Sequence, residues 1–174
     1  KVKIAAKILT LAGRTDIPLS IGPMTDPIKP RMASWVDDFN MNSYEGVVLE
    51  NGVDALSRAL DKKDIHLLGL SPATTLAPML KNGTDVSRVK LTQMAGSFHR
   101  GYDLNPKPDA EANIRYAPDD FKTLVNAPWD ITLVPLDLCG GSTITGDNYA
   151  QLQQSKHWAA RTILDAYKHW ECQH

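Results

Sequence analysis

Short apolar runs alternate with amphipathic helical patterns along this chain, and that alternation constrains its fold more than any other feature. The apolar runs, which we interpret as strands, lie at residues 17–22, 65–70, 88–94 and 130–138. The spacing of apolar residues predicts helices at residues 1–11, 51–60, 74–83, 118–125 and 157–171. Strands that are apolar throughout are typical of parallel sheets covered by helices on both faces. The sequence therefore predicts an α/β fold with an open parallel sheet and helices on both faces.

Residues at the ends of these patterns support the assignment. Gly13 stands where a helix would be capped at its C-terminus, and Asn51 stands where the next helix would be capped at its N-terminus. Pro78 is expected to shorten or bend its helix. A long irregular stretch fills residues 23–50, and such stretches tend to be binding loops. The 174 residues suit a single domain, which we expect to span residues 1–174.

Charge, hydropathy and cysteine content narrow the classes of partner and location. The net charge is −1 and the basic residues are dispersed, so we expect no nucleic-acid partner. The apolar runs are far shorter than the ~20 residues of a membrane-spanning helix, so we expect no membrane partner. Two cysteines, Cys139 and Cys172, make no disulfide framework and favour a reducing, cytoplasmic location.

The stretch NPKPDAEANIRYAPDD, which follows the third predicted strand, carries the polar residues that most resemble a site. Ligands of open parallel sheets bind beyond the carboxyl ends of the strands. Glu111 offers two acceptor oxygens, and Asn105 and Asn113 offer both donors and acceptors. Pro106 and Pro108 restrict the backbone of this loop. A carboxylate between two amides suits the neighbouring hydroxyls of a sugar. The alternative is that Glu111 and Asn113 cap the helix that follows or bond within the loop.

Four segments resemble one enzyme family when they are taken in order. They are ILTLAGRTDIPLSIG, GLSPATTLAP, MAGSFHRGYDLNPKPDAEANIRYAPDD and DITLVPLDL. Together they resemble the inosine–uridine-preferring nucleoside hydrolases, from the first helix to about Leu138. The resemblance implies a Rossmann-like core of which residues 1–174 form a partial domain.

The resemblance also implies an activity, a cofactor and site residues. Members of the family cleave the N-glycosidic bond of ribonucleosides with water and use a calcium ion. By position, Asn105, Glu111 and Asn113 match the ribose-binding residues, and Met94 matches a methionine in the pocket wall. Thr74 matches the threonine whose main-chain carbonyl binds calcium. A nucleoside is therefore the expected small-molecule substrate, and a homo-oligomer is possible.

The chain departs from the family pattern at the catalytic groups. The family's aspartate cluster, which binds calcium and supplies the general base, would lie before Lys1, and its His-Asp pair would lie beyond His174. The pair Asp37-Asp38 lacks the spacing of that cluster, and we interpret it as solvated. We therefore expect no catalytic residue within the chain and no activity from the chain alone. Alternatives are a non-catalytic ribose-binding module and a segment completed by a partner chain.

Several other residues have two interpretations. His99 and Arg100 either meet the nucleobase or are simply exposed. Cys139 precedes two glycines and is either a nucleophile or, as we prefer, part of a flexible turn. The C-terminal HWECQH is more typical of a solvated helix end than of a metal site. The aromatic residues of the long irregular stretch either stack on a base or anchor that stretch to the core: Trp35, Phe39 and Tyr44.

Overall fold

The chain forms two compact units, each built from its own set of helices and strands. The computed structural model describes residues 1–23, 32–61 and 63–171. One unit comprises residues 1–50 and 144–174, and the other comprises residues 51–143. The interpretations that involved Cys172 and the last residues of HWECQH lie outside the described residues.

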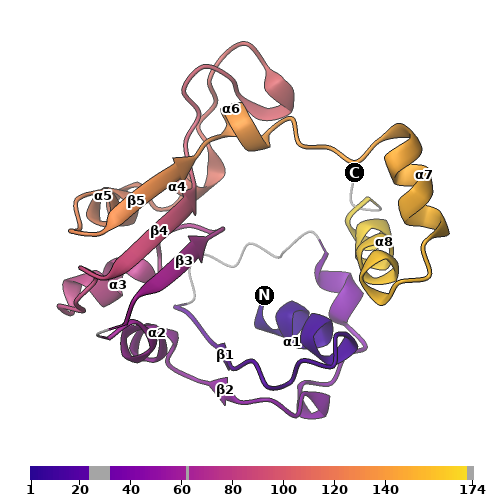
Figure 1. Cartoon of the computed structure of the whole chain (residues 1–174), viewed down its shortest axis with the longest axis horizontal. Helices are drawn as coiled ribbons and strands as arrows, with labels where there is room; N and C mark the ends of the chain where they lie inside the picture. The colour runs from indigo at the N-terminus through magenta and orange to yellow at the C-terminus, as the bar shows by residue number, and fades with distance from the viewer. Residues whose placement is uncertain (24–31, 62, 172–174) are drawn as a thin grey trace. The chain divides into compact units, whose positions relative to one another are not determined.

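A three-stranded parallel sheet forms the centre of the unit made of residues 51–143 (Figure 1). Its strands β3 (Ile65–Gly69), β4 (Val89–Met94) and β5 (Asp130–Val134) lie in the order β3-β4-β5. Leu91 is the register partner of Leu67 on one side and of Ile131 on the other. The predicted α/β class with parallel strands is therefore confirmed.

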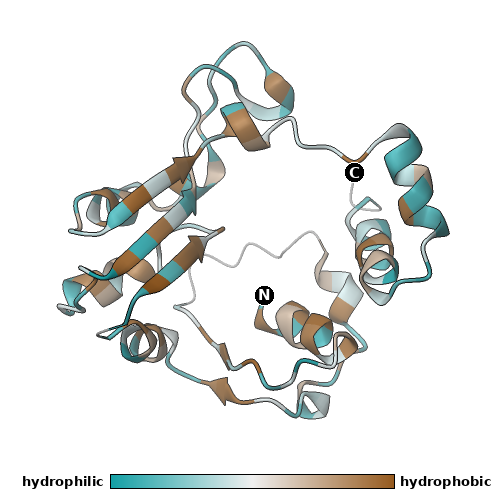
Figure 2. Cartoon of the chain, in the orientation of Figure 1, coloured by the Kyte–Doolittle hydropathy of each residue, from teal (hydrophilic) through white to brown (hydrophobic). Residues whose placement is uncertain are grey.

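Three helices of the same unit cover one face of this sheet. They are α2 (Gly52–Leu60), α3 (Leu76–Lys81) and α5 (Pro118–Val125), and α3 contacts both of the others. Side chains alternate across a strand, so Val89, Leu91 and Gln93 of β4 face the helices and are buried. Figure 2 shows the apolar segments of these strands. The buried core contains the following residues: Leu60, Ala73, Leu76, Met79, Val86, Val89, Leu91, Leu124 and Trp129.

Local signals fixed the ends of these helices largely as predicted. The Asn51 side chain caps α2 by accepting a hydrogen bond from the Asp54 amide at 3.1 Å. Helix α3 is short and has Pro78 in its first turn, where a missing amide is tolerated. Helix α5 begins at Pro118, as predicted from the sequence.

The predicted end of the last strand, at residue 138, was wrong. The strand β5 stops at Val134, and residues 136–139 form a short helix α6 (Leu136–Cys139) instead of continuing to residue 138. Pro135 lacks the amide that would extend the ladder, so the apolar run changes its structure there. A second short helix, α4 (Ala112–Tyr116), and a 3₁₀ turn, η3 (Tyr102–Leu104), lie within the loop that follows β4.

The other unit combines a two-stranded parallel pair with helices from both ends of the chain. Its elements are α1 (Val2–Leu11), β1 (Leu19–Ser20), η1 (Ala33–Val36), η2 (Met41–Ser43), β2 (Val48–Leu49), α7 (Gly146–Gln154) and α8 (Trp158–Glu171). The strand β2 and the helix α7 were not predicted. No helix in the described part of the chain combines the length and the apolar character needed to cross a bilayer.

The aromatic residues of the irregular stretch anchor it within this unit. Trp35 is buried, its indole Nε1 donates to Asp165 Oδ2 at 2.7 Å, and the Lys7 ammonium lies 4.6 Å from its ring centroid. Tyr44 is also buried, and its hydroxyl donates to the carbonyl of Ile17. The anchoring interpretation is therefore confirmed for Trp35 and Tyr44.

Candidate functional site

Glu111 caps the helix α4 and is buried while doing so. Its Oε1 accepts a hydrogen bond from the Asn113 amide at 2.7 Å, and its Oε2 accepts from the amides of Ile114 and Gly96 at 3.2 Å each. Only 4% of the residue is exposed. The capping alternative is thus confirmed for Glu111. A carboxylate has about four acceptor positions, and these three bonds leave one of them on Oε1.

Asn113 joins the end of β4 to the start of α4. Its side-chain Nδ2 donates to the Met94 carbonyl at 3.0 Å and approaches the Met94 sulfur at 3.2 Å. Both donor hydrogens therefore point toward Met94, and among the described residues the Asn113 Oδ1 takes part in no hydrogen bond. The structure brings three predicted site residues together, namely Met94, Glu111 and Asn113.

Asn105 lies in the exposed part of the same loop. Its side-chain Oδ1 accepts a hydrogen bond from the Lys107 amide at 3.0 Å, and its main chain pairs with Gly101 and Tyr102. The Asn105 side-chain amide thus braces its own turn, while its Nδ2 retains donor capacity.

Asp137 of α6 holds the beginning of this loop. Its Oδ2 accepts from the Phe98 amide at 2.8 Å, and its Oδ1 accepts from the amides of His99 and Arg100 at 2.7 and 3.1 Å. The bond from the Phe98 amide is the largest cause that keeps the pKa of the Asp137 carboxyl below its ordinary value, and the other backbone amides add to it. The carboxylate therefore stays ionised and fixes the backbone that follows β4.

A second set of bonds closes the loop on itself. The Ser97 hydroxyl donates to the Arg100 carbonyl at 2.8 Å and accepts from the Asp109 amide at 2.9 Å. Asp109 Oδ2 accepts from the Tyr102 amide at 2.9 Å, and a Cβ at Gly101 would lie 2.1 Å from that oxygen. The loop is held by side-chain acceptors as well as by its prolines.

Thr74 lies in the turn between β3 and α3, and its main-chain carbonyl has no helical partner. The neighbouring carbonyls of Ala73 and Thr75 accept bonds from the amides of Ala77 and Met79. The corresponding donor for Thr74 would be residue 78, which is Pro78 and has no N–H. A main-chain carbonyl left in this way suits a hard cation such as calcium.

The number of ligands is smaller than calcium requires. Calcium takes 6–8 oxygen ligands, and Thr74 supplies one. Among the residues that the structure describes, no group of three or more His, Cys, Asp or Glu side chains could hold a metal ion. The donor chemistry at Thr74 fits calcium, but a complete site needs further oxygens.

The remaining candidates have ordinary structural roles. The His99 side chain is exposed, while its amide bonds to Asp137. The Cys139 thiol donates to the Pro135 carbonyl at 3.3 Å within α6. Asp37 and Asp38 are exposed, as predicted for a solvated pair.

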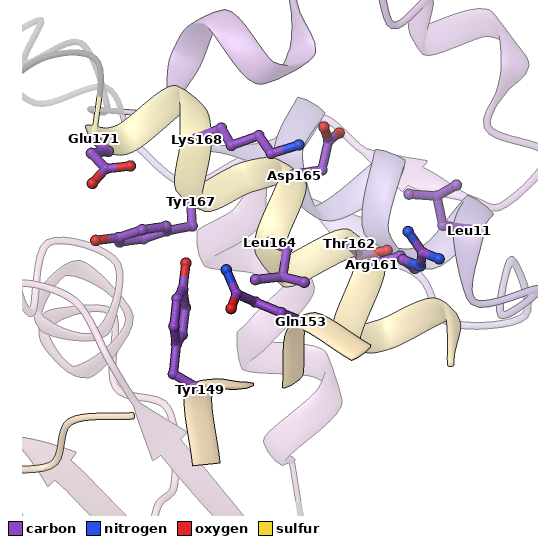
Figure 3. A pocket seen from close by; sticks show the side chains of 10 residues that line it. All are labelled: Leu11, Tyr149, Gln153, Arg161, Thr162, Leu164, Asp165, Tyr167, Lys168 and Glu171. Atoms are coloured by element: carbon purple, nitrogen blue, oxygen red, sulfur yellow. The ribbon is translucent and has the colours of Figure 1, made fainter. Parts of the chain in front are cut away.

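A cavity of about 660 Å³ lies in the unit made of residues 1–50 and 144–174. It is lined by α7 and α8 together with Leu11 of α1, and the rings of Tyr149 and Tyr167 meet edge to face with their centroids 6.4 Å apart (Figure 3). Arg161, Lys168 and Asp165 place both signs of charge around it. None of the predicted site residues lines this cavity.

Two polar residues that bond to the backbone at the ends of the strands were not singled out from the sequence. They are Asp137 and Gln93, whose side-chain Nε2 donates to the carbonyls of Ser71 and Met94. Gln93 has a readable signal, because it continues the inward positions of Val89 and Leu91 and is the polar member of that set. Asp137 had no such signal, since it was assigned to a strand.

Fold and geometry together define an α/β protein in which polar residues gather beyond the carboxyl ends of parallel strands, the place where such folds bind ligands. Comparison with known proteins identifies the family within this class. The chain belongs to the inosine–uridine preferring nucleoside hydrolase family, whose model matches residues 1–174.

Individual relatives agree with the family assignment. The chain is 26% identical to uridine nucleosidase 1 of Arabidopsis thaliana over 185 residues, covering 95% of this chain and 54% of that protein. It resembles the structure of a plant nucleoside hydrolase, the PpNRh1 enzyme, with a TM-score of 0.80, 20% identity and coverage of 97% and 57% of the two chains. It also resembles an inosine–uridine preferring nucleoside hydrolase of Bacillus anthracis, with a TM-score of 0.78, 20% identity and coverage of 97% and 62%. The chain thus spans little more than half the length of these relatives.

Proposed function

We propose that the protein carrying this sequence hydrolyses the N-glycosidic bond of ribonucleosides and that residues 94–113 bind the ribose. Family membership supports the reaction class. The observation that carries the site is the meeting of Met94, Glu111 and Asn113 at the carboxyl end of β4. A cytoplasmic location and possible self-association remain predictions from the sequence.

The ribose would be held by the hydrogen-bond donor and acceptor positions that the loop does not use within itself. One hydroxyl would donate to Glu111 Oε1, which holds one protein hydrogen bond, and a neighbouring hydroxyl would donate to Asn113 Oδ1. Asn105 Nδ2 would donate to a sugar oxygen. Because glycosidic cleavage passes through an oxocarbenium-like state, fixing the hydroxyls would orient the ring for that state.

We propose that calcium takes part and that the Thr74 carbonyl is one of its ligands. When bound, calcium would position a water and lower its pKa. The other ligands and the general base would come from outside these 174 residues, in a longer chain or in a partner chain. We therefore propose that residues 1–174 alone do not turn over nucleosides.

Release of ribose from inosine and uridine tests this function. The whole protein should release ribose, lose that activity with EDTA and regain it with calcium, while the 174-residue chain should release none. Absence of turnover by the whole protein in calcium would refute the reaction, and turnover by the short chain would refute the proposed division of the site.

A pair of asparagine variants tests the sugar contacts. Asn113→Ala should lower kcat/KM at least about tenfold, since one hydrogen bond made in the transition state is worth about 1.4 kcal/mol. Asn148→Ala, at an exposed position of α7, is the matched control and should leave kcat/KM unchanged. Equal activity of the two variants would remove Asn113 from the site.

A further inference from the structure

Gln93 is a buried amide in a position where an apolar side chain would be expected. It is 1% exposed and follows Val89 and Leu91 on the face of β4 that meets the helices. Its register partner on β3 is Gly69, and a Cβ at Gly69 would lie 1.9 Å from Gln93 Oε1. The glycine therefore provides the space across which the glutamine side chain extends.

The Gln93 amide bridges two main-chain carbonyls. Its Nε2 donates to the Ser71 carbonyl at 3.1 Å and to the Met94 carbonyl at 2.9 Å. Rotating the amide by half a turn would place Oε1 against both carbonyl oxygens, so these two bonds fix its orientation.

The Met94 carbonyl receives a second side-chain amide. Asn113 Nδ2 donates to the same oxygen at 3.0 Å. One continuous path of hydrogen bonds therefore runs from Ser71 through Gln93 and Met94 to Asn113. Ser71 begins the turn that holds Thr74, so the path joins the turn proposed to bind calcium to the loop proposed to bind ribose.

The two bonds that Gln93 Nε2 makes are accompanied by a cost to stability. Gln93 Oε1 is buried and finds no donor among the described residues, although it borders a cavity of about 150 Å³ that is lined largely by leucine side chains. An unpaired buried acceptor is unfavourable, and an apolar side chain of the same length would avoid that cost but would leave the Ser71 and Met94 carbonyls without the Gln93 donor. The amide is better explained by what its Nε2 holds in place.

We propose that Gln93 is a positioning residue that couples cation binding at the 71–75 turn to ribose binding at Asn113. This inference rests on the proposed function. Order imposed on either end of the path would lower the cost of ordering the other, and such coupling is reciprocal.

Calcium titration with and without ribose tests the coupling in the whole protein. Saturating ribose should tighten calcium binding by about fivefold or more in the native protein. In Gln93→Met the ratio of the calcium dissociation constant without ribose to that with ribose should fall below about twofold. Gly69→Ala should lower it as well, because its methyl group displaces the Gln93 amide. Gln151→Met, at an exposed position of α7, is the matched control and should keep the native ratio.

Each other outcome contradicts a definite part of the reasoning. The coupling would be overturned, and the proposed function left intact, if both Gln93→Met and Gly69→Ala kept the native ratio of calcium dissociation constants. The same holds if that ratio is one in a native protein that binds both calcium and ribose. A Gln93→Met protein that does not fold would also overturn it, because the amide would then serve stability. Failure of the native protein to bind either ligand would refute the proposed function, and the coupling with it.

Discussion

Replacing Glu111 by alanine removes the acceptor on which the loop after β4 depends. Three backbone amides would lose their partner, from Gly96, Asn113 and Ile114. Each hydrogen bond to a charged acceptor contributes about 1.5–3 kcal/mol, but bonds that share one carboxylate are not additive. Gly96 is buried, so water cannot replace the carboxylate fully there. We expect Glu111→Ala to lower the free energy of unfolding by about 3–5 kcal/mol.

Glu111→Gln separates the charge from the shape of the side chain. The amide keeps one acceptor oxygen but turns an NH₂ group toward at least one backbone donor, so we expect a loss of about 1–3 kcal/mol. The order of stability should be native, then Gln, then Ala. Glu45→Ala, at an exposed position in the other unit, is the control and should change the free energy by less than about 0.5 kcal/mol.

Urea unfolding with an unchanged m-value measures these differences. With an m-value of about 2 kcal/mol/M, the alanine variant should unfold at a urea concentration roughly 2 M lower. Faster hydrogen exchange at the amides of Asn113 and Ile114 would locate the effect. If Glu111→Ala unfolds at the same urea concentration as the native protein, the carboxylate does not support the loop as argued.

Three further predictions follow from other contacts. The folded-state pKa of Asp137 lies below its unfolded value, so its carboxylate stabilises the protein at pH values above the unfolded pKa of about 3.9. This stabilisation is lost as the pH falls through the folded pKa. In unfolding measured as a function of pH, Asp137→Asn should therefore be less stable than the native protein at pH 7 and should approach its stability below about pH 4. Pro78→Ala should weaken calcium binding about fivefold in titration, because the new amide bonds the Thr74 carbonyl at about 1 kcal/mol; unchanged affinity would exclude that carbonyl as a ligand. Trp35→Ala should lower the free energy of unfolding by about 3–5 kcal/mol, and a loss below 1 kcal/mol would contradict its role as an anchor.

The sequence predicted the elements whose pattern and end signals agree. Helix α2 has both a strong apolar face and the Asn51 cap, and its bounds were found. The apolar run from residue 130 was misassigned beyond Val134, because an apolar run alone does not distinguish a strand from a short buried helix. Helix α7 was missed because its sequence, GDNYAQLQQ, has few apolar residues, and the two-residue strand β2 was missed as well.

The site was predictable to the extent that its contacts are local. Glu111 stands two and three residues before the amides that it caps, so sequence alone offered the capping interpretation. Asp137 contacts amides 37 to 39 residues away, and only the packing of α6 beside the loop creates those bonds. Nonlocal acceptors of this kind have no periodic signal.

The polar network forms at the end of β4 because the sheet ends there on one side. The last register pair between β3 and β4 is Gly69 with Gln93, so Met94 has no partner on β3, while the Ala95 amide still bonds the Val134 carbonyl of β5 at 3.2 Å. The Met94 carbonyl is thus the first on β4 that the β3 ladder cannot satisfy, and a buried carbonyl needs a donor. The side-chain amides of Gln93, on β4 itself, and of Asn113, on α4, supply that donor. The same loss of ladder partners that makes strand ends suitable for ligands therefore also requires the amides that would position them.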